Sequence, residues 1–546
     1  MKAVIVDGYV DEPAQFGVPP YISTYPRYCA GVLGYLGYDV DYFTIDELRK
    51  LDDWDFLREY DLLLLIAGIT VPGVYIGGTP IMDKEIERIG NLRDTLKLIA
   101  GPVVRGYTIK GGRRAKKLNL TGFDHVILDD PEVYLYELLS GEKVKDRYSL
   151  IDRTIEFSTT ILKKHPYYPT VMIELELSRG CDRERFCSFC TEPVFYGRMK
   201  VRKVESVLKE VEVLSKSGVK SFRFGRISNI LAYSYNQDHS PDHRLIKDLY
   251  VGVRKCVPDL KVLHTDNANP WYLVEHRKEC EKIIEIISEN NTSGDVLSFG
   301  VESFDEKVLK LNKREGDPEK ILTAVRIVND IGGIRDENGI PRLLPGVNLL
   351  FGLMGEDENT YDLNFTYLKR ILDEGLLLRR INIRKVIPFP ATEIYRKIKR
   401  IKLDEWRFRK FKEKVRKEID LPMLRRVFPI GTILKNVIVE KVEGKMSFGR
   451  QIGSYPILVG IPKIFEKFTR LNTVIVDHGY RSVTGLNHPV NLNKASYNEL
   501  VAVYGVGGRR AESIILNRPF GSWRELEGLI EDDIIDRLKK IFTLEG

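Results

Sequence analysis

The sequence predicts an α/β protein built from several units, and three observations carry this prediction. Strand-like and helical patterns alternate over residues 1–150 and again over residues 165–395, which is typical of parallel sheets covered by helices. Short β runs punctuated by glycine occupy residues 430–488, and helical patterns return over residues 489–546. A chain of 546 residues is long enough for about three to five domains.

The first unit, residues 1–150, is predicted to be a doubly wound domain. An unbroken run of leucines within residues 61–66 indicates a parallel strand buried on both faces. An amphipathic helix closed by Gly37 precedes it. Ligands of such sheets bind at the C-terminal ends of the strands. We expect strands at residues 3–6, 61–66, 99–104 and 126–128, and helices at residues 25–38 and 131–139.

The second unit, residues 165–395, repeats the alternation at greater length. Six or so parallel strands with helices outside describe a whole or partial β/α barrel, and we expect a partial (β/α)6 barrel with its chemistry at the C-terminal mouth. Helices are expected at residues 204–217 and 318–331. The strands are expected at residues 171–177, 221–225, 261–265, 296–301, 346–351 and 381–386.

The remaining chain is more basic than the rest. The whole sequence has 85 Lys and Arg against 78 Asp and Glu, a net charge of +7, but residues 396–546 alone have 30 against 18. Residues 396–429 are predicted to be a basic helical linker, followed by a small closed β-barrel over 430–488 and helices over 489–546. A basic tail of this kind is typical of proteins that bind polyanions.

Three of the six cysteines fall within ten residues, directly after the expected strand 171–177. Five residues separate Cys181 from Cys187, and two separate Cys187 from Cys190. Three thiolates without a nearby fourth ligand leave one metal position open, which a substrate-chelating redox cluster needs. The alternative is a zinc site completed by a distant ligand, such as His165 or Cys280. Cys29, Cys256 and Cys280 are otherwise expected to be buried apolar residues.

The cysteine segment resembles the cluster loop of radical S-adenosylmethionine (radical SAM) enzymes. The match includes Glu176-Leu177-Ser178-Arg179-Gly180-Cys181 and Cys187-Ser188-Phe189-Cys190, although the family usually has three residues between the first two cysteines. Further motifs over residues 165–395 resemble strand-end elements of the same family. These are Ser221-Phe222-Arg223-Phe224-Gly225-Arg226, Phe299-Gly300-Val301-Glu302-Ser303 and Phe351-Gly352-Leu353-Met354-Gly355-Glu356.

This resemblance implies a [4Fe-4S] cluster held by Cys181, Cys187 and Cys190, with S-adenosylmethionine chelated by the free iron. One-electron reduction, from a donor such as ferredoxin or flavodoxin, would give a 5′-deoxyadenosyl radical. The implied cofactor-binding residues are Phe189, Gly225, Arg226, Asn267, Glu302 and Asn348. Glu302 could instead cap a helix or join an ion pair, Asn267 could form a turn, and Arg226 could pair with a local acid.

The first unit resembles the cobalamin-binding-like domain that precedes many radical SAM barrels. The histidine expected near the first loop of base-off cobalamin binders is missing from residues 7–10, and His125 is the unit's one histidine. The domain therefore binds cobalamin in another way or not at all. The unit also lacks the three cysteines that hold the auxiliary cluster of tRNA methylthiotransferases, which argues against sulfur insertion by their mechanism.

Two glycine-led runs in the expected barrel are Gly431-Thr432-Ile433-Leu434-Lys435-Asn436-Val437 and Gly444-Lys445-Met446-Ser447-Phe448-Gly449-Arg450-Gln451. With them the barrel resembles a TRAM domain, an RNA-binding barrel, and residues 491–546 resemble a helix-hairpin-helix module. In the barrel, Phe448 and Tyr455 are candidates for stacking on bases, while a role as spacer or lid is the alternative. In the first hairpin, the glycines of Gly505-Val506-Gly507 would let backbone N–H groups approach a phosphate, whereas a second hairpin that turns at Glu531-Asp532-Asp533 would repel one. A protein–protein contact module is the alternative there. The predicted nucleic-acid contacts are Lys397, Arg400, Arg407, Lys410, Arg450, Gly505, Gly507, Arg509 and Arg510.

Together these patterns indicate a radical SAM enzyme that methylates or otherwise functionalises a nucleoside of tRNA or rRNA. Two other hypotheses stay open: a radical SAM enzyme with a protein or small-molecule substrate, and an RNA-binding protein whose cluster is structural or redox-sensing. The longest apolar stretch, residues 62–71, is too short to span a bilayer, so we expect no membrane partner and a cytoplasmic location.

Overall fold

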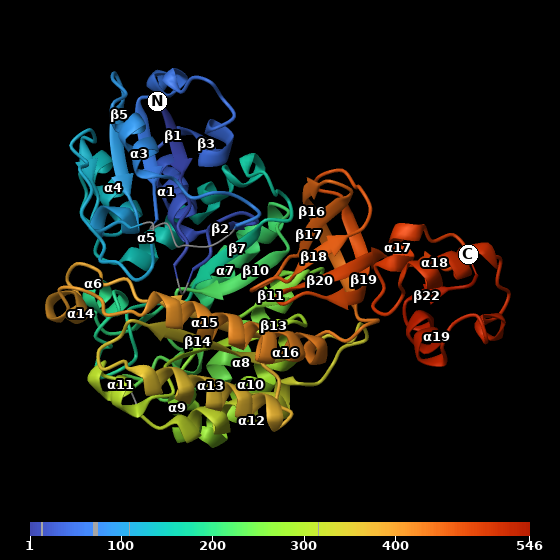
Figure 1. The fold of residues 1–546 in the computed structure, drawn as a ribbon. Coiled ribbons are helices and arrows are strands. Elements are labelled where there is room, and N and C mark those ends of the chain that lie inside the picture. The colour runs from blue at the N-terminus through green and yellow to red at the C-terminus, as the bar shows by residue number, and fades with distance from the viewer. Residues whose placement is uncertain (13–14, 69–74, 109, 315, 546) are drawn as a thin grey trace.

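The computed structural model describes residues 1–12, 15–68, 75–108, 110–314 and 316–545. Its elements group along the chain into an N-terminal α/β unit, a larger β/α unit, a small β-barrel and a C-terminal group of helices (Figure 1). The predicted α/β fold class is therefore confirmed. Across the described part of the chain, no helix combines the length and apolar character that a membrane crossing would need.

The N-terminal unit contains one parallel five-stranded sheet in the order β3-β1-β4-β5-β6. All five residues of β4 are buried, as the leucine run predicts. The strand expected at residues 99–104 lies earlier, because Gly101 adopts φ +98° and Pro102–Arg105 turns into a 3-10 helix. The edge strand β3 has no counterpart in the prediction. The bounds are β1 Lys2–Asp7, β3 Asp39–Thr44, β4 Leu62–Ile66, β5 Leu96–Ala100 and β6 His125–Val126.

Helix α1 (Thr24–Tyr35) connects this unit to the next one. The sequence pattern predicts an amphipathic helix with one solvated face, but ten of its twelve residues are buried. Its faces pack against α4 (Pro131–Ser140), α5 (Arg147–Thr154) and β7 (Met172–Glu176). The helix ends before Gly37, whose φ of +85° reverses the chain. Because α1 is enclosed on several sides, its polar residues Arg27 and Tyr28 need buried partners.

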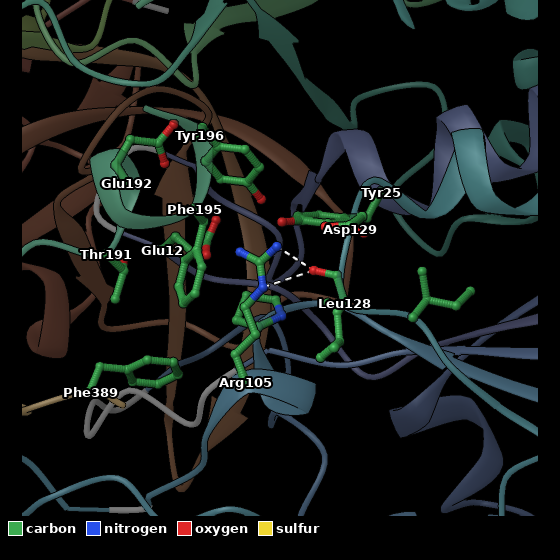
Figure 2. A pocket seen from close by; sticks show the side chains of 13 residues that line it. Glu12, Tyr25, Arg105, Leu128, Asp129, Thr191, Glu192, Phe195, Tyr196 and Phe389 are labelled. Carbon is green, nitrogen blue, oxygen red and sulfur yellow. Dashed lines mark hydrogen bonds between the residues drawn. The ribbon is translucent and has the colours of Figure 1, made fainter. Parts of the chain in front are cut away.

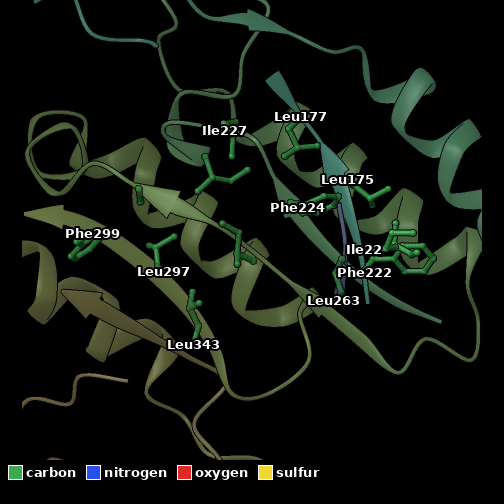
Figure 3. Close-up of a cluster of buried hydrophobic side chains, with 14 of the residues drawn as sticks. Ile22, Leu175, Leu177, Phe222, Phe224, Ile227, Leu263, Leu297, Phe299 and Leu343 are labelled. Carbon is green, nitrogen blue, oxygen red and sulfur yellow. The ribbon is translucent and has the colours of Figure 1, made fainter. Parts of the chain in front are cut away.

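The second unit is an open barrel made of two parallel four-stranded sheets, β11-β10-β7-β2 and β12-β13-β14-β15. The six predicted strands are all confirmed, and β2 (Tyr21–Ile22) from the N-terminal segment pairs beside β7. Leucine and phenylalanine side chains, including Leu175, Phe222 and Phe299, fill its core (Figure 3). The bounds are β7 Met172–Glu176, β10 Ser221–Gly225, β11 Val262–His264, β12 Asn267–Ala268, β13 Asp295–Glu302, β14 Leu343–Phe351 and β15 Arg380–Lys385.

Amphipathic helices enclose this barrel, as the alternating pattern predicts. Two of them match the expected positions closely, namely α7 (Val204–Lys216) and α12 (Pro318–Gly332). The others with comparable length are α8 His243–Cys256, α10 Arg277–Asn290 and α13 Glu358–Asp373.

The basic stretch folds as helices that lead into a closed five-stranded barrel, so the predicted small β-barrel is confirmed. The connecting helices are α14 Glu393–Lys397, α15 Glu405–Val415 and α16 Leu421–Val427. Tyr455 is not available for base stacking, because it is buried with its ring 5.1 Å from that of Phe16. The barrel strands are β16 Ile433–Glu443, β17 Met446–Gln451, β18 Leu458–Ile461, β19 Arg470–His478 and β20 Ser482–Asn487.

The C-terminal helices lie beyond the small barrel at one end of the molecule (Figure 1). They enclose a core of their own, which includes Leu500, Ile514 and Leu538. Strands β21 (Val490–Asn491) and β22 (Phe542–Thr543) pair in parallel and join the two ends of this unit. The helices are α17 Tyr497–Val501, α18 Gly508–Leu516 and α19 Asp532–Lys539, and the last begins at the predicted second turn.

Candidate functional site at the cysteine loop

The three clustered cysteines lie in a loop that follows β7 and is closed at its base by a short hairpin. Strands β8 (Ser178–Arg179) and β9 (Lys200–Val201) pair antiparallel, and the Cys181 N–H donates to the Gly197 carbonyl at 3.1 Å. Gly180 adopts φ +85°, and a Cβ there would lie 2.5 Å from the Arg198 carbonyl oxygen. The glycine before Cys181 is therefore required for the close return of the chain.

The thiols of this loop lie near enough to affect one another. Burial raises the pKa of Cys181 to about 12, with Asp182 and the Cys187 thiol as smaller causes. Burial also raises the pKa of Cys190 well above its usual range, and the Cys187 and Cys181 thiols add to the shift. Ionising all three thiols together needs a strong positive charge, which a bound metal cluster supplies.

The distant residues that would complete a zinc site, His165 and Cys280, lie in other surroundings. In the described ranges, no three His, Cys, Asp or Glu side chains are grouped closely enough to hold one metal ion. His165 instead packs between Tyr42 and Tyr167, and Cys280 lies buried in helix α10. Zinc needs about four ligands at 2.0–2.3 Å, whereas an iron–sulfur cluster spreads its thiolates over several irons.

Arg314 joins the cysteine loop to the end of β13. Its Nη1 lies 3.6 Å from Sγ of Cys187. Burial raises the pKa of Glu302, the last residue of β13, while Arg314 counteracts the shift. A Cβ at Gly300 would lie 3.0 Å from Oε1 of Glu302 and 3.5 Å from Nη2 of Arg314. A carboxylate and a guanidinium thus lie close to Gly300 beside the loop, and their opposite charges suit the amino and carboxylate groups of a zwitterionic ligand.

The other predicted cofactor residues occupy different positions around the same barrel mouth. Gly225 ends β10, and its carbonyl accepts from the Leu177 N–H at 3.2 Å. Asn267 lies in β12 and donates to the Ile227 carbonyl at 3.4 Å. Phe189 packs beside Val308, Leu353, Val386 and Ile394. Asn348 lies within β14, where its Oδ1 accepts from Asn382 at 2.7 Å.

Arg226 points to the N-terminal unit. Its side chain is buried, its backbone φ is +54°, and its Nη1 donates to Oε2 of Glu12. Oε2 of Glu192 lies 3.8 Å from its Nη2. The alternative in which Arg226 pairs with a local acid therefore describes its observed contacts.

A cleft lies between the C-terminal strand ends of the N-terminal sheet and the helix that follows Cys190. Its empty volume, which includes open solvent, is about 470 Å³. Figure 2 shows Arg105 at its centre, bonded to the Leu128 carbonyl, and its guanidinium lies 3.8 Å from the ring centroid of Phe195. No sequence pattern predicted Arg105, because its contact with Phe195 joins two units that are distant in the chain.

Buried ion pairs hold the N-terminal unit against the barrel, and we call them the ionic clamp. Glu210 on α7 accepts from Arg27 at 2.6 Å and also from Arg202, and all three side chains are fully buried. Glu176 accepts from Arg179 at 2.7 Å and also from Arg147. Burial raises the pKa of each glutamate, but the paired arginines outweigh it and hold both pKa values below their usual range.

The predicted nucleic-acid residues fall into two groups. Lys397, Arg400, Lys410 and Arg509 are exposed. Three further arginines are engaged by acids, since Arg407 pairs with Glu358, Arg450 with Glu440, and Arg510 with Glu531, and the exposed Lys397 and Lys410 also pair, with Glu393 and Glu413. Gly507 caps α18 with open space beside it, whereas a Cβ at Gly505 would meet Arg537 and Ile534 of α19. Gly505 therefore serves the packing of the hairpin, and Arg450 and Arg510 are already neutralised.

Comparisons with known proteins find several chains similar to this one. The family model of the radical SAM superfamily matches residues 175–362. "Uncharacterized protein MJ0274" of Methanocaldococcus jannaschii is 43% identical over 89% of this chain and 93% of that protein. The tRNA-2-methylthio-N(6)-dimethylallyladenosine synthase of Bdellovibrio bacteriovorus is 26% identical over 35% of this chain and 38% of that enzyme. The structure of the radical S-adenosylmethionine methyltransferase TsrM from Kitasatospora setae is 15% identical in sequence, with a TM-score of 0.49. The alignment covers 72% of this chain and 74% of the TsrM chain.

Proposed function

Because the chain belongs to the radical SAM superfamily, we propose that it is an enzyme that modifies a nucleoside of tRNA or rRNA. The family uses a [4Fe-4S] cluster and S-adenosylmethionine. The observation that carries the proposal is the cysteine loop itself, with three mutually interacting thiols beside Glu302 and Arg314. Cys181, Cys187 and Cys190 would hold the cluster. When bound, it supplies the electron that converts S-adenosylmethionine into a hydrogen-abstracting 5′-deoxyadenosyl radical.

The chain's own residues provide position and exclusion of water. Glu302 and Arg314 offer opposite charges to the amino and carboxylate groups of an amino-acid moiety, and Phe189 offers an apolar face. The ionic clamp holds the N-terminal unit close to the cysteine loop and so shields one side of the mouth. These residues orient the substrate, while the bond-breaking step belongs to the cofactors.

Two features support RNA as the substrate. The closed small barrel resembles a TRAM domain, and the C-terminal hairpin resembles a helix-hairpin-helix module. Exposed cations lie along residues 396–429 and at Arg509. The relative from Bdellovibrio bacteriovorus is named for a modification of tRNA adenosine. The first 150 residues contain only one cysteine, Cys29, so an auxiliary cluster for sulfur insertion lacks its ligands there. Methylation or another carbon-centred change is therefore the reaction we propose.

Cobalamin binding stays a prediction. The cleft in Figure 2 borders the cysteine loop, but no histidine is found among the described residues that line it. The absorbance spectrum of protein reconstituted with hydroxocobalamin and then desalted tests this prediction directly.

The proposed function is tested in two steps. Anaerobic reconstitution should give an iron–sulfur protein that cleaves S-adenosylmethionine to 5′-deoxyadenosine. Nucleoside mass spectrometry of total RNA from a deletion strain should then show one modified nucleoside missing. Cleavage together with an unchanged nucleoside profile would favour a protein or small-molecule substrate, and absence of cleavage would leave an RNA-binding protein with a structural cluster.

A further inference from the structure

A second pocket lies at the opposite end of the barrel strands from the cysteine loop. It is bounded by Arg379 and Arg380 at the start of β15, Asp420 before α16, and Tyr455 and Arg481 in the small barrel. Its empty volume, open solvent included, is about 520 Å³. Because the cysteine loop follows the other end of the strands, this pocket is separate from the site described above.

Guanidinium groups dominate this pocket. Arg379 just before β15, Arg380 at its start and Arg481 in the small barrel line the pocket, and Arg416, between α15 and α16, acts on Asp420 without being part of the lining; we call these four residues together the arginine pocket. None of these four arginines takes part in an ion pair within the described chain, and the buried Nε atoms of Arg379 and Arg416 have no hydrogen-bond partner there. The contacts that do exist are neutral: Arg379 donates to the Tyr455 carbonyl at 3.1 Å and Arg380 to Asn382 at 2.6 Å.

The pKa shifts of the groups in this pocket also indicate an excess of positive charge. Burial and the nearby Arg481 lower the pKa of Arg380 to about 9, and burial lowers that of Arg379 to about 10. Burial raises the pKa of Asp420 to about 6 although Arg481, Arg416 and Arg380 oppose the shift. Lys412 and Arg384 add further positive charge nearby, and Asp295 is the carboxylate that acts on Arg379. The cations thus outnumber the carboxylates.

Such an arrangement is costly without a bound anion. A buried charge is stable when it is paired, and several unpaired guanidiniums at one place repel one another. The guanidinium fork matches the oxygens of a phosphate, and arginine is the usual residue for phosphate and nucleic-acid recognition. The exposed ring of Tyr480 at the rim adds a surface on which a base can stack.

We propose that the arginine pocket binds a backbone phosphate of the RNA substrate and anchors the RNA away from the cysteine loop. This inference rests on the proposed function, because it takes the substrate to be RNA. The RNA would then be bound by a pocket between three units as well as by the scattered exposed cations. A free phosphate or a small phosphorylated molecule has the same chemistry, and the experiment separates it from RNA.

The test uses the full-length protein and fluorescein-labelled bulk tRNA in an anisotropy titration at several salt concentrations. The variant Arg380→Gln/Arg481→Gln should bind about 10- to 100-fold more weakly than wild type, as expected for the loss of two charge-assisted contacts. The slope of log affinity against log salt should fall by about 0.7 for each lost phosphate contact. The matched control Lys467→Gln/Arg470→Gln removes two exposed cations from the same small barrel and should change affinity less than about twofold.

The single variant Arg481→Gln keeps the test decisive if the double variant folds poorly, because Arg481 is exposed. Equal losses in the pocket variant and the control, or no loss in either, would overturn the inference while leaving RNA modification intact. A second arm measures the melting temperature with inorganic phosphate and tripolyphosphate. If these stabilise wild type but not the variant, and wild type does not bind tRNA, the pocket serves a small phosphate and both the inference and the RNA proposal fail.

Discussion

In the ionic clamp, Arg27 and Arg202 share the carboxylate of Glu210, and Arg147 and Arg179 share that of Glu176. Asp130 and Glu132 provide further acids for the second pair. In the arginine pocket, by contrast, the guanidiniums of Arg380, Arg416 and Arg481 act on Asp420 without forming an ion pair with it in the part of the chain that the structure describes. Both regions place arginines between units that are distant in sequence, but the clamp arginines are paired with carboxylates, whereas the pocket arginines, which are half-buried or in the case of Arg481 exposed, form no ion pair in the described chain.

This difference distinguishes arginines that stabilise the fold from arginines that are available to bind a ligand. A buried arginine with its own carboxylate already has the partner that its burial requires, so it holds two units together. A buried arginine without one leaves a binding capacity that something outside the chain can use. The molecule therefore has a closed interface beside the cysteine loop and an open one at the opposite end of the barrel.

The largest expected effect concerns the cysteine loop, which lies beside the ionic clamp. Cys190→Ala should reduce S-adenosylmethionine cleavage by at least about 10³-fold, because it removes a proposed cluster ligand. Cys256→Ala is the matched control, since Cys256 lies at the end of α8 outside the loop. Anaerobic assays of 5′-deoxyadenosine and iron content measure both variants. Wild-type cleavage by Cys190→Ala would contradict the proposed cluster site.

The next effect compares the two regions directly through stability. Glu210→Gln leaves two buried guanidiniums without their shared carboxylate and should lower the free energy of unfolding by about 3–5 kcal/mol. Arg416→Gln in the arginine pocket removes a repelling charge and should leave stability unchanged or raise it. Thermal denaturation of both variants checks this. Similar losses in the two variants would show that the proposed distinction between balanced and unbalanced charge is wrong.

The sequence predicted the elements of this fold better than the contacts between its units. The strands around Leu175, Phe222 and Phe299 were predictable because apolar runs report local burial, and the cysteine spacing identified the loop. Strand β2 has only two residues and pairs with β7 across about 150 residues of chain, so no local pattern marks it. The clamp and the arginine pocket combine segments from three or more distant places, and their charge balance exists only after folding.

Asp7 provides a third case, a buried carboxyl whose described partners are neutral. It accepts from the Tyr9 N–H at 2.9 Å and the Tyr42 hydroxyl at 2.8 Å, and burial raises its pKa to about 7. Because the folded pKa exceeds the unfolded value of 3.8, its contribution to stability is complete below about pH 4 and is lost as the pH rises through about 7.

Asp7→Asn keeps the shape and removes the titration. The variant should therefore gain stability relative to wild type between pH 5 and pH 8, by at most about 4 kcal/mol. Melting temperatures across this range measure the gain. The prediction fails if the difference between the two proteins is constant with pH, since Asp7 would then be ionised throughout or protonated throughout.

The smallest expected effect tests the same distinction on the surface of the C-terminal helices. Arg509 and Arg510 are adjacent at the start of α18, but Arg510 forms a bidentate pair with Glu531 whereas Arg509 is exposed. If only unpaired cations are available to phosphate, Arg509→Ala should weaken tRNA binding about two- to threefold, and Arg510→Ala should weaken it less. Anisotropy titrations at low salt resolve such differences. Larger losses for Arg510→Ala would mean that RNA displaces Glu531, and that pairing in the free protein does not decide which arginines bind.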